Sequence, residues 1–203
     1  MQSHFLLPLY PLDGLVLLPT LKVEVCPVGT VATKVFQRAV EHQHQLVASC
    51  YEDESVHEVG VLARVFLPDD EKPRAVLQAV SRCRLRKLVA EDVPMVLAEE
   101  FPDTPRPFQR TEPLRRLLLT RYARLCLHLN LPLPRELRNL PLWQLTWKLT
   151  SQLNLDFRQQ QGLLNLPDPV TRGQILLLAV KDLERKERFL RPFAKLRKGG
   201  QWN

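Results

Sequence analysis

The side chains with reactive chemistry are few in this chain, and the densest group lies in one short stretch. His42, His44, Ser49, Cys50 and Glu52 follow one another closely. A cysteine activated by a histidine is a common nucleophile, and histidines with a carboxylate are common metal ligands. The two histidines have no third ligand at metal-binding spacing, and such a pair on a polar helix end or loop is usually solvated. We therefore expect no catalytic cysteine and no metal site here.

Two other kinds of enzyme are not expected either. A loop that cradles nucleotide phosphates needs the pattern G-x-x-x-x-G-K-[ST], and no glycine of this chain begins it. No serine lies in the glycine-rich turn that exposes a nucleophilic serine. The cysteines are at least 24 residues apart and form no C-x-x-C pair, which favours reduced, mostly buried thiols: Cys26, Cys50, Cys83 and Cys126. The sequence predicts a protein that is not an enzyme and needs no cofactor.

Two groups of basic residues are candidates for binding an anion. Arg82, Arg84 and Arg86 alternate along a predicted strand, at steps of roughly 7 Å on one face. They can bind an anion or an acidic peptide, or be neutralised across the sheet by Glu99 and Glu100, and we favour the second interpretation.

The second group lies at the C-terminal end, where it can contact nucleic-acid phosphates. Asp182, Glu184 and Glu187 are interleaved with it, so pairing along the helix also explains these charges. The candidate basic patch consists of Arg185, Arg188, Arg191, Lys195 and Lys198.

Charge divides the chain into two parts. Residues 1–107 hold 11 Lys+Arg and 15 Asp+Glu, a net charge of −4. Residues 108–203 hold 18 and 7, a net charge of +11, and the sum is the total of +7. The segment 101–113 between them is rich in proline. An acidic part joined to a basic part by such a linker predicts two domains, 1–107 and 108–203.

The period of the apolar residues also changes at this linker. The N-terminal part shows the alternation of β-strands, with one helix over Thr30–His42 that turns Val31, Val35 and Ala39 inward. The strands are expected at 21–25, 45–50, 59–67, 80–88 and 93–101.

The C-terminal part has helical spacing throughout. Its first helix is expected to begin with Thr111 as N-cap and Pro113 in the first turn. Further helices are expected at 142–153, at 157–164 and from Asp168 or Pro169 onward, and Pro192 must kink or end the last one.

The start of the chain shows no targeting signal. The first 21 residues contain no Lys or Arg, and Pro8, Pro11 and Asp13 interrupt their apolar run, so we expect no signal peptide. No apolar stretch reaches 18 residues, so we expect no membrane span. Reduced cysteines agree with a reducing compartment, and the sequence predicts a soluble, cytoplasmic protein.

Several segments, in this order, match the sequence patterns of one known protein family. Leu7–Leu12 and Leu15–Pro19 match the opening LPL-x-PL and VVLFP patterns, and Val59–Val65 matches the VGT-[VL]-A-[RK]-[VI] strand. The hairpin return is matched by Val76, Leu77, Arg82, Arg84 and Leu85, and Leu166–Val170 is similar to the LPD turn before a long helix. Together these segments resemble the N-terminal domain of the Lon protease family. Three departures concern the loops: Thr20 and Ala79 stand where the family has glycine, and Cys26-Pro27 where it usually has phenylalanine.

The resemblance implies an α+β fold in which a PUA-like β pseudo-barrel with one or two helices precedes an α-helical bundle. It further implies a stand-alone, non-catalytic module that binds unfolded or tagged polypeptides or serves a protease in protein quality control. We expect binding through exposed apolar side chains of the segment 17–25, with Leu17, Leu21 and Val23 as candidates. The alternative function is RNA or DNA binding through the basic C-terminal helix, because PUA-like folds often bind RNA.

Overall fold

The computed structural model describes residues 4–68 and 74–190, and its contacts divide the chain into two compact units. The first, which we call the sheet unit, comprises Met1–Asp103 and Asn154–Pro167. The second, the helical unit, comprises Thr104–Leu153 and Asp168–Asn203. The α+β class predicted from the sequence is confirmed.

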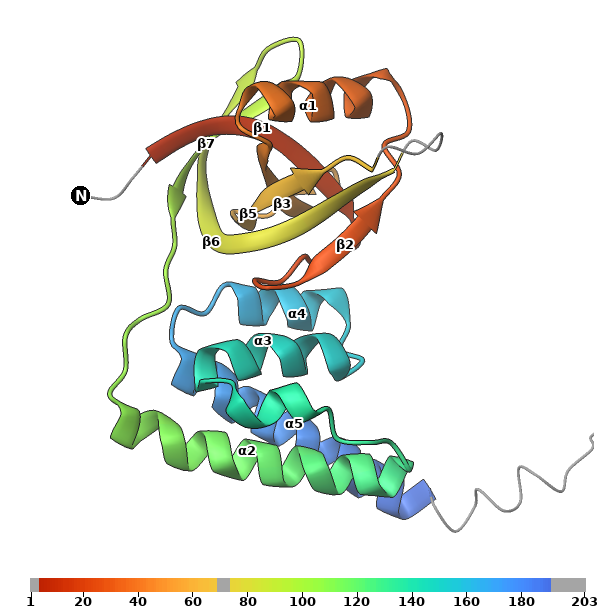
Figure 1. Cartoon of the computed structure of the whole chain (residues 1–203), viewed down its shortest axis with the longest axis vertical. Helices are drawn as coiled ribbons and strands as arrows, with labels where there is room; N and C mark the ends of the chain where they lie inside the picture. The colour runs from red at the N-terminus through yellow and green to blue at the C-terminus, as the bar shows by residue number, and fades with distance from the viewer. Residues whose placement is uncertain (1–3, 69–73, 191–203) are drawn as a thin grey trace, which may run out of the picture. The chain divides into compact units, whose positions relative to one another are not determined.

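A closed sheet forms the body of the sheet unit (Figure 1). Its strands follow the order β1-β7-β6-β5-β3, and β3 returns to β1 through the one parallel pairing. β4 extends β3, and β2 pairs with β6 beside this ring. Closure leaves the five ring strands without long free edges. The strands are β1 (His4–Asp13), β2 (Lys22–Val25), β3 (Gln45–Glu52), β4 (Ser55–Val56), β5 (Val59–Phe66), β6 (Ala75–Ala90) and β7 (Pro94–Glu100).

Two bulges let the long strand β6 pair with β5 and with β7 in turn. Opposite β5 the register shifts between Leu62 and Ala63, so that Val80 has no partner of its own. Opposite β7 it shifts again between Leu85 and Lys87, at Arg86. Each extra residue bends the strand and reverses the side on which the following residues point. Val80 and Arg86 therefore point outward, and both are exposed.

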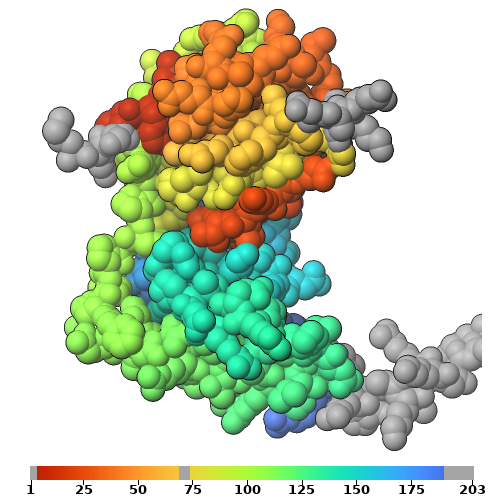
Figure 2. Space-filling model, in the orientation of Figure 1, coloured from red at the N-terminus to blue at the C-terminus, as the bar shows by residue number. Residues whose placement is uncertain are grey.

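Small and branched residues fill the interior of the ring. One core cluster joins four strands through Leu7, Leu9, Val47, Cys83, Val96 and Ala98. Gly60 of β5 lies where a side chain would not fit, because a Cβ atom there would come within 2.5 Å of the Ala48 carbonyl oxygen. Helix α1 (Thr30–Glu41) packs on the sheet through Val35, Phe36 and Ala39. Helix α1 contacts β1, β3 and β5, and on the face shown in Figure 2 its orange surface lies beside the yellow surface of strands that follow it in the chain.

The segment Asn154–Pro167 returns to the sheet unit from the C-terminal half. Its helix α4 (Phe157–Leu164) begins with a capping box between Asp156 and Gln159. The Gln161 side chain donates a hydrogen bond to the Val59 carbonyl at 2.8 Å, and Arg158 pairs with Glu52 at 2.6 Å. The prediction of a single break at residue 107 did not anticipate this return, because the periodicity of α4 is helical like that of its neighbours.

The helical unit consists of α2 (Phe108–Leu129), the short 3-10 helix η1 (Arg135–Asn139), α3 (Leu142–Gln152) and α5 (Pro169–Leu190). α2 packs against α5, and α3 contacts both. Leu118, Leu176 and Val180 are fully buried between the helices. The buried Arg172 places its guanidinium 3.9 Å from the centre of the Trp147 ring, which compensates its charge by a cation–π contact.

Most predicted elements are confirmed within a few residues, but the start of α2 is a correction. The helix begins at Phe108, a turn before the predicted N-cap Thr111, and Pro113 lies inside it. The prediction relied on the preference of proline for the first turn. Here the proline removes one hydrogen bond to residue 109, and because that turn faces solvent, water can satisfy the carbonyl. Val31 is a second correction, since its side chain is 57% exposed and not part of the core.

Gly60→Ala should destabilise the sheet unit, because the new methyl group would meet the backbone of β3 and force two paired strands apart. We expect a loss of about 1–3 kcal/mol in the free energy of unfolding, measured by urea denaturation. Gly162→Ala is the matched control: this position lies in α4 with no atom within 4 Å of the added Cβ, so stability should rise by up to about 1 kcal/mol. Unchanged stability of Gly60→Ala would show that the strands are not held this closely.

Candidate functional site

The three residues predicted to contact a polypeptide lie in and before β2. Leu17 is 5% exposed and thus buried. Val23 is paired with Leu77, and Leu21 accepts a hydrogen bond from the Ala79 amide at 2.9 Å. Because Leu77 and Ala79 are buried, the apolar side of β2 points into the sheet unit. Leu21 and Val23 remain half-buried, and their role in binding stays a prediction.

The arginine row on β6 does not lie on one outward face, as the sequence predicted, because its first member is buried. Arg82 is 3% exposed, and its guanidinium donates to the carbonyls of Leu164 and Leu166, both at 2.9 Å, and to Asp103 at 2.7 Å. Its charge is therefore used inside the protein and is not free for an anion.

The other two arginines of the row are also engaged. Arg84 and Arg82 both lie over the ring of Phe101, at 4.3 and 4.5 Å from its centre. Arg86 pairs with Glu99, as the cross-strand interpretation predicted. The arginines of this strand therefore form structural contacts with Phe101 and Glu99 in place of an anion site.

Only part of the predicted basic patch lies in the part of the chain that the structure describes. Arg185 and Arg188 are exposed on α5, and Arg185 approaches the Asp182 carboxylate at 3.9 Å. Arg191, Lys195 and Lys198 lie outside the described residues, as does Pro192. The patch therefore stays a prediction.

The surroundings of Cys50 disfavour the reactive form of its thiol. Burial raises the pKa of the Cys50 thiol, and the nearby carboxylates of Glu52 and Asp13 raise it further, so the reactive thiolate is disfavoured. The Ser49 hydroxyl donates to the His57 carbonyl at 2.9 Å. Across residues 4–68 and 74–190, no group of three His, Cys, Asp or Glu side chains is placed to hold a metal ion.

Two surface hollows with largely apolar walls lie among the described residues of the sheet unit. The first, which we call the α1 hollow, has a volume of about 490 Å³ and lies between α1, the linker before it and the ends of β5 and β6. Its apolar walls include Pro27, Phe36, Val40 and Leu67. Val40 is 40% and Leu67 46% exposed, so both present apolar surface to solvent.

The second, the hairpin hollow, has a volume of about 520 Å³ and lies beside the β6–β7 turn. Leu9 and Met95 form its buried floor, and Val31, Tyr51 and Leu88 are exposed walls.

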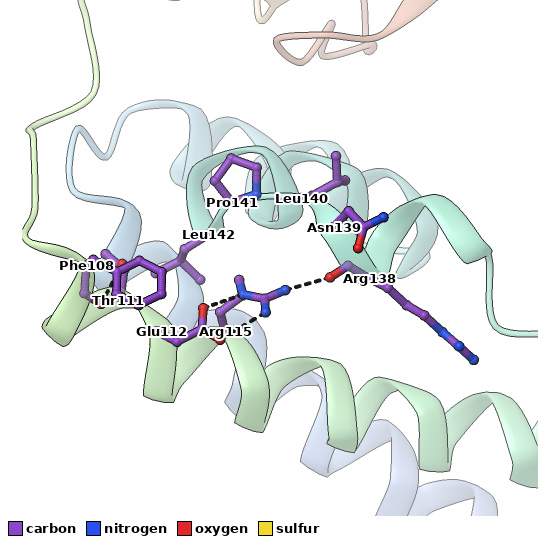
Figure 3. A pocket seen from close by; sticks show the side chains of 9 residues that line it. All are labelled: Phe108, Thr111, Glu112, Arg115, Arg138, Asn139, Leu140, Pro141 and Leu142. Atoms are coloured by element: carbon purple, nitrogen blue, oxygen red, sulfur yellow. Dashed lines mark hydrogen bonds and ion pairs between the residues drawn. The ribbon is translucent and has the colours of Figure 1, made fainter.

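A third hollow, of about 400 Å³, belongs to the helical unit (Figure 3). Arg115 and Glu112 point toward each other on α2, with contacts of 2.6 and 3.0 Å, and Arg115 also donates to the Arg138 carbonyl at 2.8 Å. Arg116 pairs with the same glutamate at 2.7 Å. These two arginines lower the pKa of Glu112 to about 2. The polar groups of this hollow hold α2 and η1 together.

Sequence reasoning missed all three hollows, because each is lined by segments far apart in the chain. The available signal was the presence of apolar residues at helix positions outside the inward stripe, such as Val40 on α1. Such residues do not by themselves indicate a binding surface, since single exposed apolar side chains are common.

Among the described residues, no helix combines the length and the apolar character that crossing a bilayer requires.

Comparison with known proteins points to one family. The family model of the ATP-dependent protease La (LON) substrate-binding domain matches residues 6–182. No curated protein sequence matches the chain. The N-terminal domain of the Mycobacterium avium complex Lon protease has a similar structure, with a TM-score of 0.71, 16% identity, and coverage of 88% of this chain and 99% of that one. A Lon N-terminal domain protein from Xanthomonas campestris aligns with a TM-score of 0.65, 20% identity, and coverage of 86% and 98%. Both likenesses concern the fold.

Arg82→Met should destabilise the sheet unit, because it removes the buried hydrogen bonds to the carbonyls of Leu164 and Leu166 and to the Asp103 carboxylate. We expect a loss of roughly 3 kcal/mol in the free energy of unfolding. Arg84→Met is the control, since it removes a stacking contact worth about 1 kcal/mol or less. Equal losses for the two variants, measured by urea denaturation, would show that the buried contacts of Arg82 do not hold the segment 154–167.

The ion pairs of Glu112 should make stability depend on pH in the acid range. Its folded pKa of about 2 lies below the ordinary value of 4.5, so the pairs stabilise fully above pH 4.5 and are lost as the pH falls toward 2. Glu112→Gln should therefore have a lower Tm than wild type at neutral pH, and the difference should shrink between pH 4.5 and 2. Glu136→Gln in η1 is the control, whose Tm profile should stay parallel to wild type. A constant difference for Glu112→Gln would contradict this assignment.

Proposed function

This chain belongs to the family of ATP-dependent protease La (LON) substrate-binding domains, and we propose that it binds unfolded polypeptides without catalysing a reaction on them. Its role would be substrate recognition in protein quality control, alone or as an accessory of a protease. A cytoplasmic location is part of the same proposal.

The observation that supports this proposal most directly is the accessible apolar surface around the α1 hollow. Val40 and Leu67 line it while keeping 40% and 46% of their surface in solvent. Val28 and Phe66, the sequence neighbours of the lining residues Pro27 and Leu67, are 84% and 43% exposed. Exposed apolar side chains grouped around a hollow are typical of a surface that receives other apolar groups. A volume of about 490 Å³ can take side chains of different shapes, which suits partners without a fixed sequence.

The strength of such binding follows from the area available. Burying about 60–80 Å² of apolar surface on each of a few side chains contributes roughly 1.5–2 kcal/mol apiece. Association and ordering of a flexible chain oppose this gain. We therefore expect affinities on the order of micromolar, with little dependence on sequence.

Nucleic-acid binding by the helical unit is the second candidate. Within its described residues, 104–153 hold nine Lys+Arg and two Asp+Glu, and 168–190 hold five and four, so 14 positive charges face six negative ones. Such an excess favours contact with phosphates. A steep loss of affinity with added salt would distinguish this binding from apolar polypeptide binding.

Replacing the exposed apolar walls of the α1 hollow should weaken polypeptide binding. We expect the double variant Val40→Ser, Leu67→Ser to bind a permanently unfolded protein, such as reduced and carboxymethylated lactalbumin, about tenfold more weakly than wild type by fluorescence anisotropy. These positions are better probes than Leu21 and Val23, whose side chains point toward the core.

The control is Leu127→Ser on α2, where the leucine is 74% exposed in the other unit, and it should bind like wild type. The unfolded protein should be recovered intact with or without ATP. No binding by wild type would contradict the function, and unchanged binding by the double variant would contradict the place assigned to it.

A further inference from the structure

The hairpin hollow lies where two strands of the closed sheet part. β1 pairs with β7 only over His4–Pro8, and from Leu9 onward its described partner is β3 alone. The β6–β7 hairpin continues beyond that point to the turn at Glu91 and Asp92. A hollow of about 520 Å³ therefore remains between the end of β1 and the hairpin. It is a consequence of how the ring closes.

The walls of the hairpin hollow are apolar and accessible. Leu9 and Met95 at the floor are 3% and 2% exposed, so they belong to the core. Val31 and Leu88 on the walls are 57% and 58% exposed, and Tyr51 is 37% exposed. A partner that covers these three side chains would bury apolar surface from three separate elements, α1, β3 and β6.

The charged residues that line this hollow are acidic. Its only charged lining residues are Glu91 and Asp92, and no lining residue is basic. Glu91 is 3.4 Å from Arg38, which does not line the hollow. Asp92 forms no ion pair among the described residues, although its charge also helps to raise the pKa of Arg38. Lys34 on α1 and Lys87 on β6 are exposed nearby in sequence but do not line the hollow.

The net charge of the sheet unit that surrounds this hollow is also negative. Residues 1–103 hold ten Lys+Arg and 15 Asp+Glu, and 154–167 add one of each, which gives 11 − 16 = −5 for the sheet unit. The α1 hollow, in contrast, is lined by both Glu41 and Arg74, so its rim favours neither sign. A negative rim around apolar walls attracts positive groups and repels negative ones.

From this combination we infer that the hairpin hollow binds a short apolar segment of an unfolded polypeptide that has lysine or arginine beside it. This inference rests on the proposed function and adds the class of segment that the protein selects. The apolar side chains enter between Val31 and Leu88, and the basic side chain lies against Asp92 and Glu91 at the turn. Segments flanked by acidic residues are disfavoured at the same place.

Two synthetic peptides test this inference. They share one short apolar core, and one has lysines on both sides while the other has glutamates. By fluorescence anisotropy at about 50 mM NaCl we expect the lysine-flanked peptide to bind roughly five- to tenfold more tightly, because exposed ion pairs each contribute a few-fold. At about 500 mM NaCl this preference should fall below about twofold, since salt screens exposed charges.

Variants of the whole chain locate the effect. Asp92→Lys should abolish or reverse the preference, and Leu88→Ser should weaken binding of the lysine-flanked peptide about fivefold. Val80→Ser is the matched control, because Val80 is 53% exposed on the same strand and does not line the hollow. The salt dependence of wild type needs no variant and therefore remains a test if a substitution lowers the Tm.

The outcomes separate this inference from the function on which it rests. Equal binding of the two peptides, or a preference that Asp92→Lys leaves unchanged, would overturn the inference while unfolded lactalbumin still binds. Failure of both peptides with retained lactalbumin binding would also overturn it. If wild type binds neither the peptides nor lactalbumin, the proposed function itself is wrong.

Discussion

A single buried guanidinium joins three distant parts of the sheet unit. Arg82 extends from β6 and meets the carbonyls at the end of α4 and the carboxylate of Asp103, which follows β7. The last carbonyls of a helix have no partner within the helix, and a buried charge needs several hydrogen bonds. The guanidinium of Arg82 therefore supplies donors to these carbonyls, and the carbonyls supply acceptors to the buried charge. The return of the segment 154–167 to the sheet depends on this contact, supported by Gln161 and Arg158.

Closure of the sheet sets the second constraint, and it connects the core to the surface hollows. The ring needs β6 to pair with β5 and then with β7, which the bulges at Val80 and Arg86 allow. It also needs β1 to leave β7 after Pro8 and join β3. Where strands part in this way, apolar side chains that would otherwise be covered remain accessible. The hairpin hollow arises from the same geometry that buries Leu9 and Met95.

The two units differ in the sign of their net charge, and in both units many charged side chains are paired inside the protein. In the helical unit many arginines are used for internal contacts, such as Arg115 with Glu112 and Arg172 over Trp147. In the sheet unit Arg82 and Arg86 are likewise paired with carboxylates, whereas Asp92 at the hairpin turn has no ion pair among the described residues. Net charge alone therefore does not locate a binding surface, because paired charges attract little.

Local periodicity in the sequence determined most elements of the fold. Short apolar runs bounded by turns predicted β3 and β5, and helical spacing predicted α1, α3 and α4. These features depend on neighbouring residues, and the order of the motifs was enough to indicate the family. Tertiary structure alone decided that Arg82 is buried, that Leu21 and Val23 point inward and that the hollows exist. The physical reason is that burial and charge pairing depend on contacts between segments far apart in the sequence, and a local sequence pattern does not specify these contacts.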